Sequence, residues 1–158
     1  MKKLPFIHII TVFLVVACSA PAIATPAIRP MPSVILVGNL ERYRAKGSGT
    51  ISLQVSKDGT SINHINLIIK DTTTDCVNVN DSTGKMGFGG FKLPLTGLFP
   101  IDHAKFMVNI SRKGKLEGKF ISATEAEGSV RLILEPAMFG GLHTCDFGTW
   151  SWDAKLQY

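Results

Sequence analysis

The residues best suited to chemistry in this chain are its three cysteines and four histidines. His143 and Cys145 stand two positions apart, so on one strand both side chains would point to the same face. A zinc site needs three or four ligands, and a disulfide at Cys145 would remove the thiolate. We therefore expect neither a metal nor any other cofactor.

Catalytic motifs are equally sparse. The residues of a Ser–His–Asp triad come together in space, so their order along the chain does not reveal one. The G-x-S-x-G motif, which would mark a nucleophilic serine on a tight turn, is absent. Glu125 and Glu127 stand two apart, where a solvated strand face is expected rather than the cleft that glycoside hydrolysis requires. The glycine-rich stretch 84–91 is no P-loop, because Val79 replaces the first glycine and Met86 follows Lys85. We predict that the protein is not an enzyme.

One segment has the composition of an ion-binding loop. Residues 71–84 (DTTTDCVNVNDSTG) are rich in Asp, Asn, Thr and Ser, and oxygen-rich loops bind calcium in many exported modules. The segment has no EF-hand spacing, and the same residue types are ordinary turn formers. A calcium loop and a plain turn both stay open as interpretations.

The N-terminus carries an export signal. Lys2 and Lys3 precede an apolar run at 7–17 that is eleven residues long and broken only by His8 and Thr11. This pattern is typical of a secretory signal peptide, and the run is too short to span a bilayer as a stable anchor. We expect an exported protein, located in the periplasm, at the cell surface or outside the cell.

Two cleavage positions compete. A cut after residue 17 follows a lipobox-like sequence and makes Cys18 the lipidated N-terminus, whereas the A-x-A sequence at 22–24 predicts a cut after residue 24. Lipidation accounts for the odd cysteine and would be the only membrane contact of the protein. We take 1–17 as the signal peptide and keep the cut after 24 as the alternative.

The proline content predicts where the folded domain begins, and the net charge bears on the class of partner. Four prolines between residues 19 and 32 predict a solvated tether over 18–33, followed by one domain over 34–158. The net charge is +5 and falls to +3 without Lys2 and Lys3. Because the basic residues are scattered, no nucleic-acid surface is expected.

The domain shows the period-two alternation of β-strands. Apolar and polar residues alternate in six stretches, namely 51–56, 65–69, 106–111, 116–120, 126–134 and 150–156. Turn residues separate these stretches, which indicates an all-β, antiparallel, two-sheet sandwich. Trp150 and Trp152 alternate in register with Ala154, which favours core positions for both rings.

Cys76 and Cys145 are the expected disulfide. Export makes the bond chemically reasonable, and it closes a loop of about seventy residues. In the chain-entropy model such a loop is worth roughly 4 kcal/mol. The bond also removes both thiols from the set of nucleophiles.

Two short motifs carry a resemblance. A hairpin pattern G-x-F-x-S-x-x-x-A-x-G fits at Gly118 to Gly128, and the ending C-D-x-G-x-x-x-W-x-A fits at Cys145 to Ala154. In these motifs the chain resembles a group of exported bacterial β-sandwich domains of unknown function, over about 110 residues from 47 to 156. The resemblance implies an all-β sandwich with the two cysteines paired, and it implies no activity.

We therefore expect a non-enzymatic domain that binds or scaffolds at the cell envelope. Its recognition surface is expected on long end loops at 71–90, 94–104 and 136–144. An apolar patch of Phe88, Phe99 and Phe139 is the predicted contact with a partner. The alternatives are a small extracellular hydrolase, which needs His103 or His143 beside a carboxylate, and a carbohydrate-binding module, which needs solvent-facing aromatic rings.

Overall fold

The computed structural model describes residues 27–42, 47–78, 83–135 and 143–157. Its regular elements in these residues are all β-strands, as the alternating apolar pattern predicts. The strands are β1 (Ile35–Arg42), β2 (Ser48–Val55), β3 (Ser61–Asn78), β4 (Thr83–Pro100), β5 (Lys105–Asn109), β6 (Lys115–Phe120), β7 (Glu125–Leu134) and β8 (His143–Leu156).

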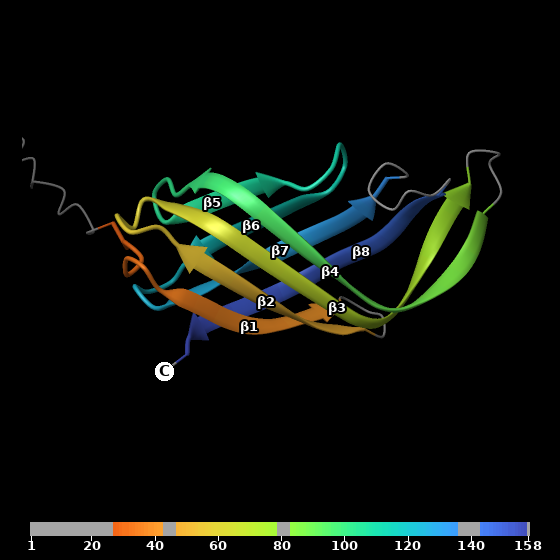
Figure 1. The fold of residues 1–158 in the computed structure, drawn as a ribbon, viewed down its shortest axis with the longest axis horizontal. Helices are drawn as coiled ribbons and strands as arrows, with labels where there is room; N and C mark the ends of the chain where they lie inside the picture. The colour runs from red at the N-terminus through yellow and green to blue at the C-terminus, as the bar shows by residue number, and fades with distance from the viewer. Residues whose placement is uncertain (1–26, 43–46, 79–82, 136–142, 158) are drawn as a thin grey trace, which may run out of the picture.

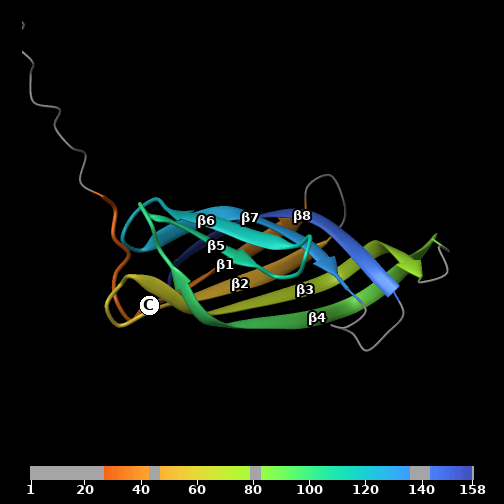
Figure 2. The same cartoon turned by 90° about the horizontal axis from the view of Figure 1, so that it is seen from above.

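The eight strands form one antiparallel sheet in the order β4-β3-β2-β1-β8-β7-β6-β5. The sheet coils until its two edge strands approach each other, so the fold is nearly closed and barrel-like (Figure 1). Figure 2 shows β4 and β5 meeting at the end where the turn 101–104 joins them. The all-β, antiparallel prediction is confirmed, but the apolar faces are buried inside one coiled sheet and not between two separate sheets.

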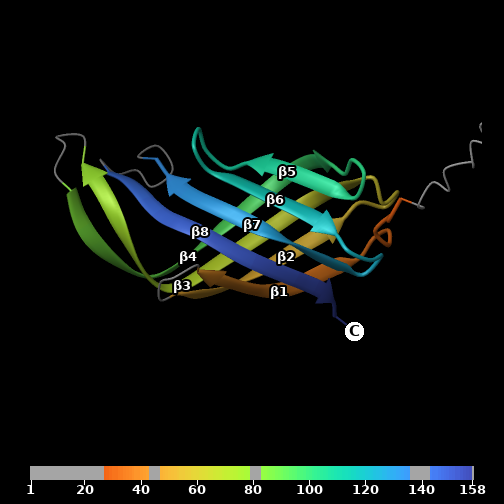
Figure 3. The same cartoon turned by 180° about the vertical axis from the view of Figure 1, so that it is seen from behind.

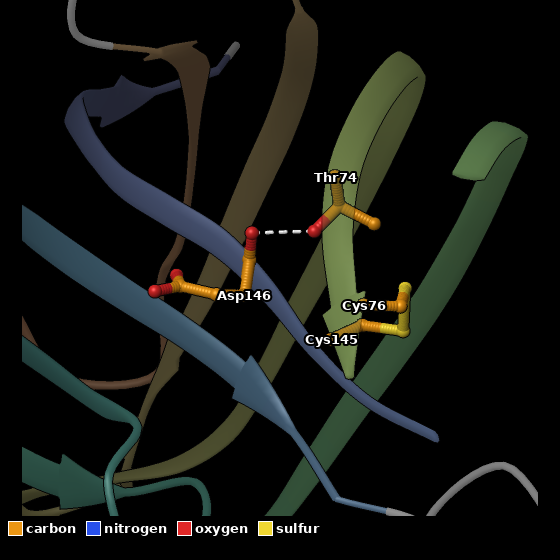
Figure 4. The surroundings of a disulfide bond; sticks show 4 residues. All are labelled: Thr74, Cys76, Cys145 and Asp146. Carbon is orange, nitrogen blue, oxygen red and sulfur yellow. Dashed lines mark hydrogen bonds between the residues drawn. A yellow bond between two sulfur atoms is a disulfide. The ribbon is translucent and has the colours of Figure 1, made fainter. Parts of the chain in front are cut away.

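The sheet divides around the β1–β2 hairpin, which lies between β3 and β8. Beyond the end of this hairpin, β3 and β8 pair directly, with Cys76 opposite Cys145. The two cysteines form the expected disulfide across this pair, with their Cα atoms 4.1 Å apart (Figure 4). Beside the bond, the Thr74 hydroxyl donates to the main-chain carbonyl oxygen of Asp146. The disulfide prediction is confirmed.

A β-bulge in β8 changes which residues face the core. Cys145 and Phe147 are buried at odd positions, whereas Trp150 and Trp152 are buried at even positions. The change occurs at Gly148, which has a φ of 77° and lies where the register with β7 shifts. One extra residue reverses the side-chain alternation, so both halves of β8 supply core side chains. The expected core positions of the two tryptophans are confirmed.

Hydrogen bonds hold the bulge in place. The carboxylate of Asp146 accepts the Gly148 N–H at 2.7 Å and an Arg131 N–H at 2.5 Å from the neighbouring strand. The Trp150 indole N–H donates to the carbonyl oxygen of Phe147 at 3.0 Å. These contacts satisfy groups that the irregular backbone would otherwise leave unpaired.

Most of the expected end loops are strands. Over 71–78, 83–90 and 94–100 the chain belongs to β3 and β4, which pair from Ser61–Pro100 to Val77–Thr83. Thr favours strands here, but Asn and Gly do not, and Pro94 cannot donate a ladder hydrogen bond. Since β4 is an edge strand, Pro94 is tolerated there. Residues 79–82 and 136–142 of the expected loops lie outside the described part.

The segment expected to be a solvated tether is described from residue 27, and over 30–33 it is joined to the barrel although most of its residues are exposed. It crosses one end of the barrel, from the β6–β7 turn to the β2–β3 turn. The Met31 N–H donates to the Ala123 carbonyl at 2.8 Å, and the Ser33 N–H donates to the Ser56 carbonyl at 3.0 Å. Pro30 between them is buried. Packed structure therefore begins before Val34.

The disulfide generates a stability prediction. Replacing Cys76 and Cys145 together by alanine should lower the free energy of unfolding by about 4 kcal/mol, because the bond closes a loop with a sequence separation of 69. Urea unfolding of the oxidised protein and the double variant measures the difference. The reduced wild-type protein should match the variant, and equal midpoints for oxidised and reduced protein would refute the prediction.

The β2–β3 turn generates a second prediction. Hydrogen bonds from the Ser56 hydroxyl (2.5 Å) and the Thr60 N–H (3.1 Å) lower the pKa of Asp58 from 3.8 to about 2. A lowered pKa stabilises the fold above pH 3.8, and this contribution disappears as the pH falls through about 2. NMR titration of the Asp58 carboxyl should give a midpoint near 2, and Ser56→Ala should move it toward 3.8. A midpoint that Ser56→Ala leaves unchanged would contradict the assignment.

Candidate functional site

Two glycines and two aromatic rings form one row across four strands. Phe106 pairs with Gly118, Gly118 with Gly128, and Gly128 with Trp152. On the inner side the rings of Phe106 and Trp152 lie against the glycines, with their centroids 6.0 Å apart. A Cβ atom on Gly118 would lie 2.5 Å from the Phe106 ring and 2.6 Å from the Trp152 ring. The interior packing therefore requires glycine at this position.

On the outer side the same row is the floor of a groove. Figure 3 shows β5 to β8 side by side on this face of the molecule. The groove has a volume of about 780 Å³. Its walls are outward-facing side chains of β5, β6, β7 and β8, with Pro100 at one edge; they are Lys105, Met107, Glu117, Lys119, Glu127, Ser129 and Ser151. The bare backbone of the glycines separates these side chains into two rows.

The walls combine charge with one apolar side chain. The Nζ of Lys119 lies 2.9 Å from Oε1 of Glu127 across the β6–β7 pair. Glu117 is paired with Lys115, two positions before it on β6, at 2.8 Å. Met107 is 56% exposed, which is high for a methionine on a sheet. The groove thus offers cations, carboxylates and an apolar contact together.

The histidines do not build a catalytic site in the described part of the chain. His103 lies 2.7 Å from the carboxylate of Asp102, but both side chains are more than four-fifths exposed and neither lines the groove. His64 Nδ1 lies 3.3 Å from the Thr96 hydroxyl. His143 pairs through its backbone with Asn78. The described residues hold no group of three or more His, Cys, Asp or Glu side chains arranged for a metal.

From the expected partner patch, the structure places Phe99 and the backbone of Phe88. Phe99 is partly buried against the core, and the backbone of Phe88 pairs with Thr72. Both belong to β4, eleven residues apart, which is about 35 Å along a strand. Phe139 and the lipidation candidate Cys18 lie outside the described residues.

The two sequence motifs serve the architecture. In the hairpin motif, Gly118 faces Gly128 and Phe120 faces Ala126, on either side of the β6–β7 turn. In the ending motif, Cys145 forms the disulfide, Asp146 and Gly148 form the bulge, and Trp152 supplies the ring that packs against the glycines. The motif glycines were the only signal for the groove, because which residues face each other depends on register.

The glycine row generates a prediction about packing. Gly128→Ala should destabilise the protein by about 2–3 kcal/mol, since the new Cβ would lie 2.0 Å from the Glu117 carbonyl oxygen and 2.6 Å from the Trp152 ring. Ser129→Ala, one residue away on the outer face, should stay within about 0.5 kcal/mol of wild type. Thermal unfolding compares the two variants, and equal effects would refute the packing argument.

No helix in the described residues is long and apolar enough to cross a membrane. No protein-family model matches the chain, and no curated protein or solved structure shows significant similarity to it.

Proposed function

We propose that this protein is an exported domain of the cell envelope that binds an extended peptide segment of a partner protein in its outer groove. The groove over Gly118 and Gly128 is the observation that carries the proposal. Its volume of about 780 Å³ lies within the range of specific ligand sites. The domain is a binding module in this proposal and not an enzyme.

The shape of the groove supports an extended chain as ligand. Outward residues of one strand stand two positions apart, about 7 Å between their Cα atoms, so the groove runs across β5 to β8 between two rows of side chains. Met107 supplies an apolar contact, and Lys105 and Glu117 supply charges that can pair with peptide side chains or termini. A peptide uses all three kinds of contact.

A carbohydrate ligand has less support. Sugar sites usually stack the ring of the sugar on an exposed aromatic side chain. The aromatic residues nearest the groove, Phe106 and Trp152, turn their rings into the core and are 4% and 3% exposed. A hydrolase has less support too, because the His103–Asp102 pair is solvated and lies outside the groove.

Export and lipid anchoring belong to the same proposal. The signal-like N-terminus favours export, and the Cys76–Cys145 disulfide is compatible with an oxidising compartment. We propose that Cys18 is the lipidated N-terminus and that the likeness to exported domains with the C-D-x-G-x-x-x-W-x-A ending reflects kinship. The mass of the processed N-terminus tests the anchor: acylated Cys18 agrees with it, and a free Thr25 amine rejects it.

A pair of matched serines tests the groove. Ser129→Tyr should fill the groove from its wall, whereas Ser52→Tyr places the same side chain on the outer face of β2, outside the groove. A random dodecapeptide phage library is selected on the wild-type protein, and the affinities of the selected peptides are measured by isothermal titration calorimetry. Ser129→Tyr should weaken binding about tenfold or more, and Ser52→Tyr should leave it unchanged.

The opposite results are also informative. If no peptide is selected, or if both tyrosine variants bind equally well, the groove is not a peptide site. Circular dichroism and unfolding midpoints close to wild type confirm that both variants are folded, since both serines are half-buried outer-face residues in strands of the same sheet.

A further inference from the structure

One end of the barrel gathers the chain entry, three turns and the C-terminus. The three turns are 56–60, 101–104 and 121–124, and the segment 27–34 runs across them. Figure 1 shows this segment, in orange, at the same end of the molecule as the C-terminus. Leu156 near the C-terminus donates its N–H to Thr124 in the β6–β7 turn. We call this part of the molecule the entry end.

The entry end exposes large apolar side chains. Ile28, Met31 and Ile121 are each 41% to 43% exposed. Met31 is hydrogen-bonded to the turn that contains Ile121, through Ala123, so the two belong to one region of the surface. Isolated exposed apolar residues are common on soluble proteins and need no explanation. A group of exposed apolar residues at one end of the molecule does need an explanation.

The other exposed large hydrophobic side chains of the described residues are Ile35, Leu98 and Met107. Ile35 begins β1, at the entry end. Leu98 and Met107 instead lie on the wall of the barrel: Leu98 belongs to the edge strand β4, and Met107 is the middle residue of β5 and lines the outer groove. The apolar group at the entry end is therefore Ile28, Met31 and Ile121, with Ile35 at the same end.

The length of the preceding chain restricts what this end can meet. Ala27, the first described residue, stands nine positions after Cys18. Fully extended, this stretch reaches about 30 Å. A lipid on Cys18 would hold the entry end close to the bilayer, whereas the opposite end is a full barrel length farther away. The end that a lipid on Cys18 would tether is therefore the end that exposes Ile28, Met31 and Ile121.

We propose that the entry end docks on the phospholipid surface, with Ile28, Met31 and Ile121 inserted at the level of the headgroups. The inference rests on the lipid anchor of the proposed function. Arg29 and Lys57, both exposed at this end, can reach lipid phosphates while the apolar side chains insert. Asp58 and Asp102 lie at the same end, so the attraction is mainly apolar. The outer groove then faces sideways, parallel to the membrane plane.

Tryptophan scanning with brominated lipid tests the orientation. Both native tryptophans are buried, at 0% and 3% exposure, so they add a nearly constant background. Ile121→Trp places a ring at the entry end, and Lys113→Trp places one in the β5–β6 turn at the opposite end. Full-length chains are expressed in a bacterium, purified after processing and mixed with excess vesicles of phosphatidylethanolamine and phosphatidylglycerol, with and without bromine on the acyl chains.

Bromolipid should reduce the added emission of Ile121→Trp by about twofold and leave that of Lys113→Trp unchanged. Equal quenching at both positions, or none at Ile121→Trp, overturns the proposal. A blue shift of Ile121→Trp that grows with protein concentration in the absence of vesicles, together with no bromine quenching, would show instead that two copies meet at this end, which also overturns it.

A second experiment separates docking from anchoring. In the unlipidated Cys18→Ala background, replacing Ile28, Met31 and Ile121 by serine should lower vesicle cosedimentation about tenfold, because three apolar side chains no longer leave water. The matched control Leu98→Ser, on the side of β4, should cosediment like its parent. If the parent does not bind vesicles at all, or if the control loses as much, docking is wrong even where mass spectrometry finds acylated Cys18. If Thr25 is the N-terminus, the anchor fails, and the vesicle assays still decide docking.

Discussion

The direct pairing of β3 with β8 is the constraint on which the rest of the structure depends. These two strands are separated by the β1–β2 hairpin at one end of the barrel and must converge where the hairpin stops. Convergence brings Cys76 opposite Cys145, and the covalent bond removes the freedom of the long strands to separate. The hydrogen bond from Thr74 to Asp146 and the ion pair of Asp146 with Arg131 continue the same connection into β7. The junction therefore links β3, β8 and β7 at the end of the barrel where the β1–β2 hairpin stops.

The candidate site is a consequence of interior packing. Phe106 and Trp152 occupy the space that side chains at Gly118 and Gly128 would fill, so the whole row points into the interior and its outer side is main chain alone. Any outer ligand would therefore contact main chain that has no freedom to adjust, because rings support it from below. The same residues determine the packing of β5 to β8 and the floor of the groove. Stability and recognition are linked at these positions, and substitutions there affect both.

The sequence predicted the strand class and the core well where alternation was regular. The residues around Ile51, Leu67 and Trp152 occupy the faces that their spacing indicates, and both cysteines pair as expected. It failed over β3 and β4, where the Asp, Asn, Gly and Pro residues resemble a loop and pairing between long strands overrides their low strand propensity. The single coiled sheet was not predictable because bulges such as that at Gly148 reverse the buried face without an unambiguous signal. The groove was hidden for a related reason, since it exists only once register brings two distant glycines together.

The segment across the entry end also restricts the order in which the parts of the chain can fold. Met31 and Ala123 are on the order of ninety residues apart in the chain, yet one hydrogen bond joins them. Contacts of such long range cannot form until most of the polypeptide is present, and they slow folding because a large loop must close first. The first packed residues of the domain are thus among the last to find their partners. A chain with this connectivity stays open during synthesis, which suits the export across a membrane that we propose for this protein.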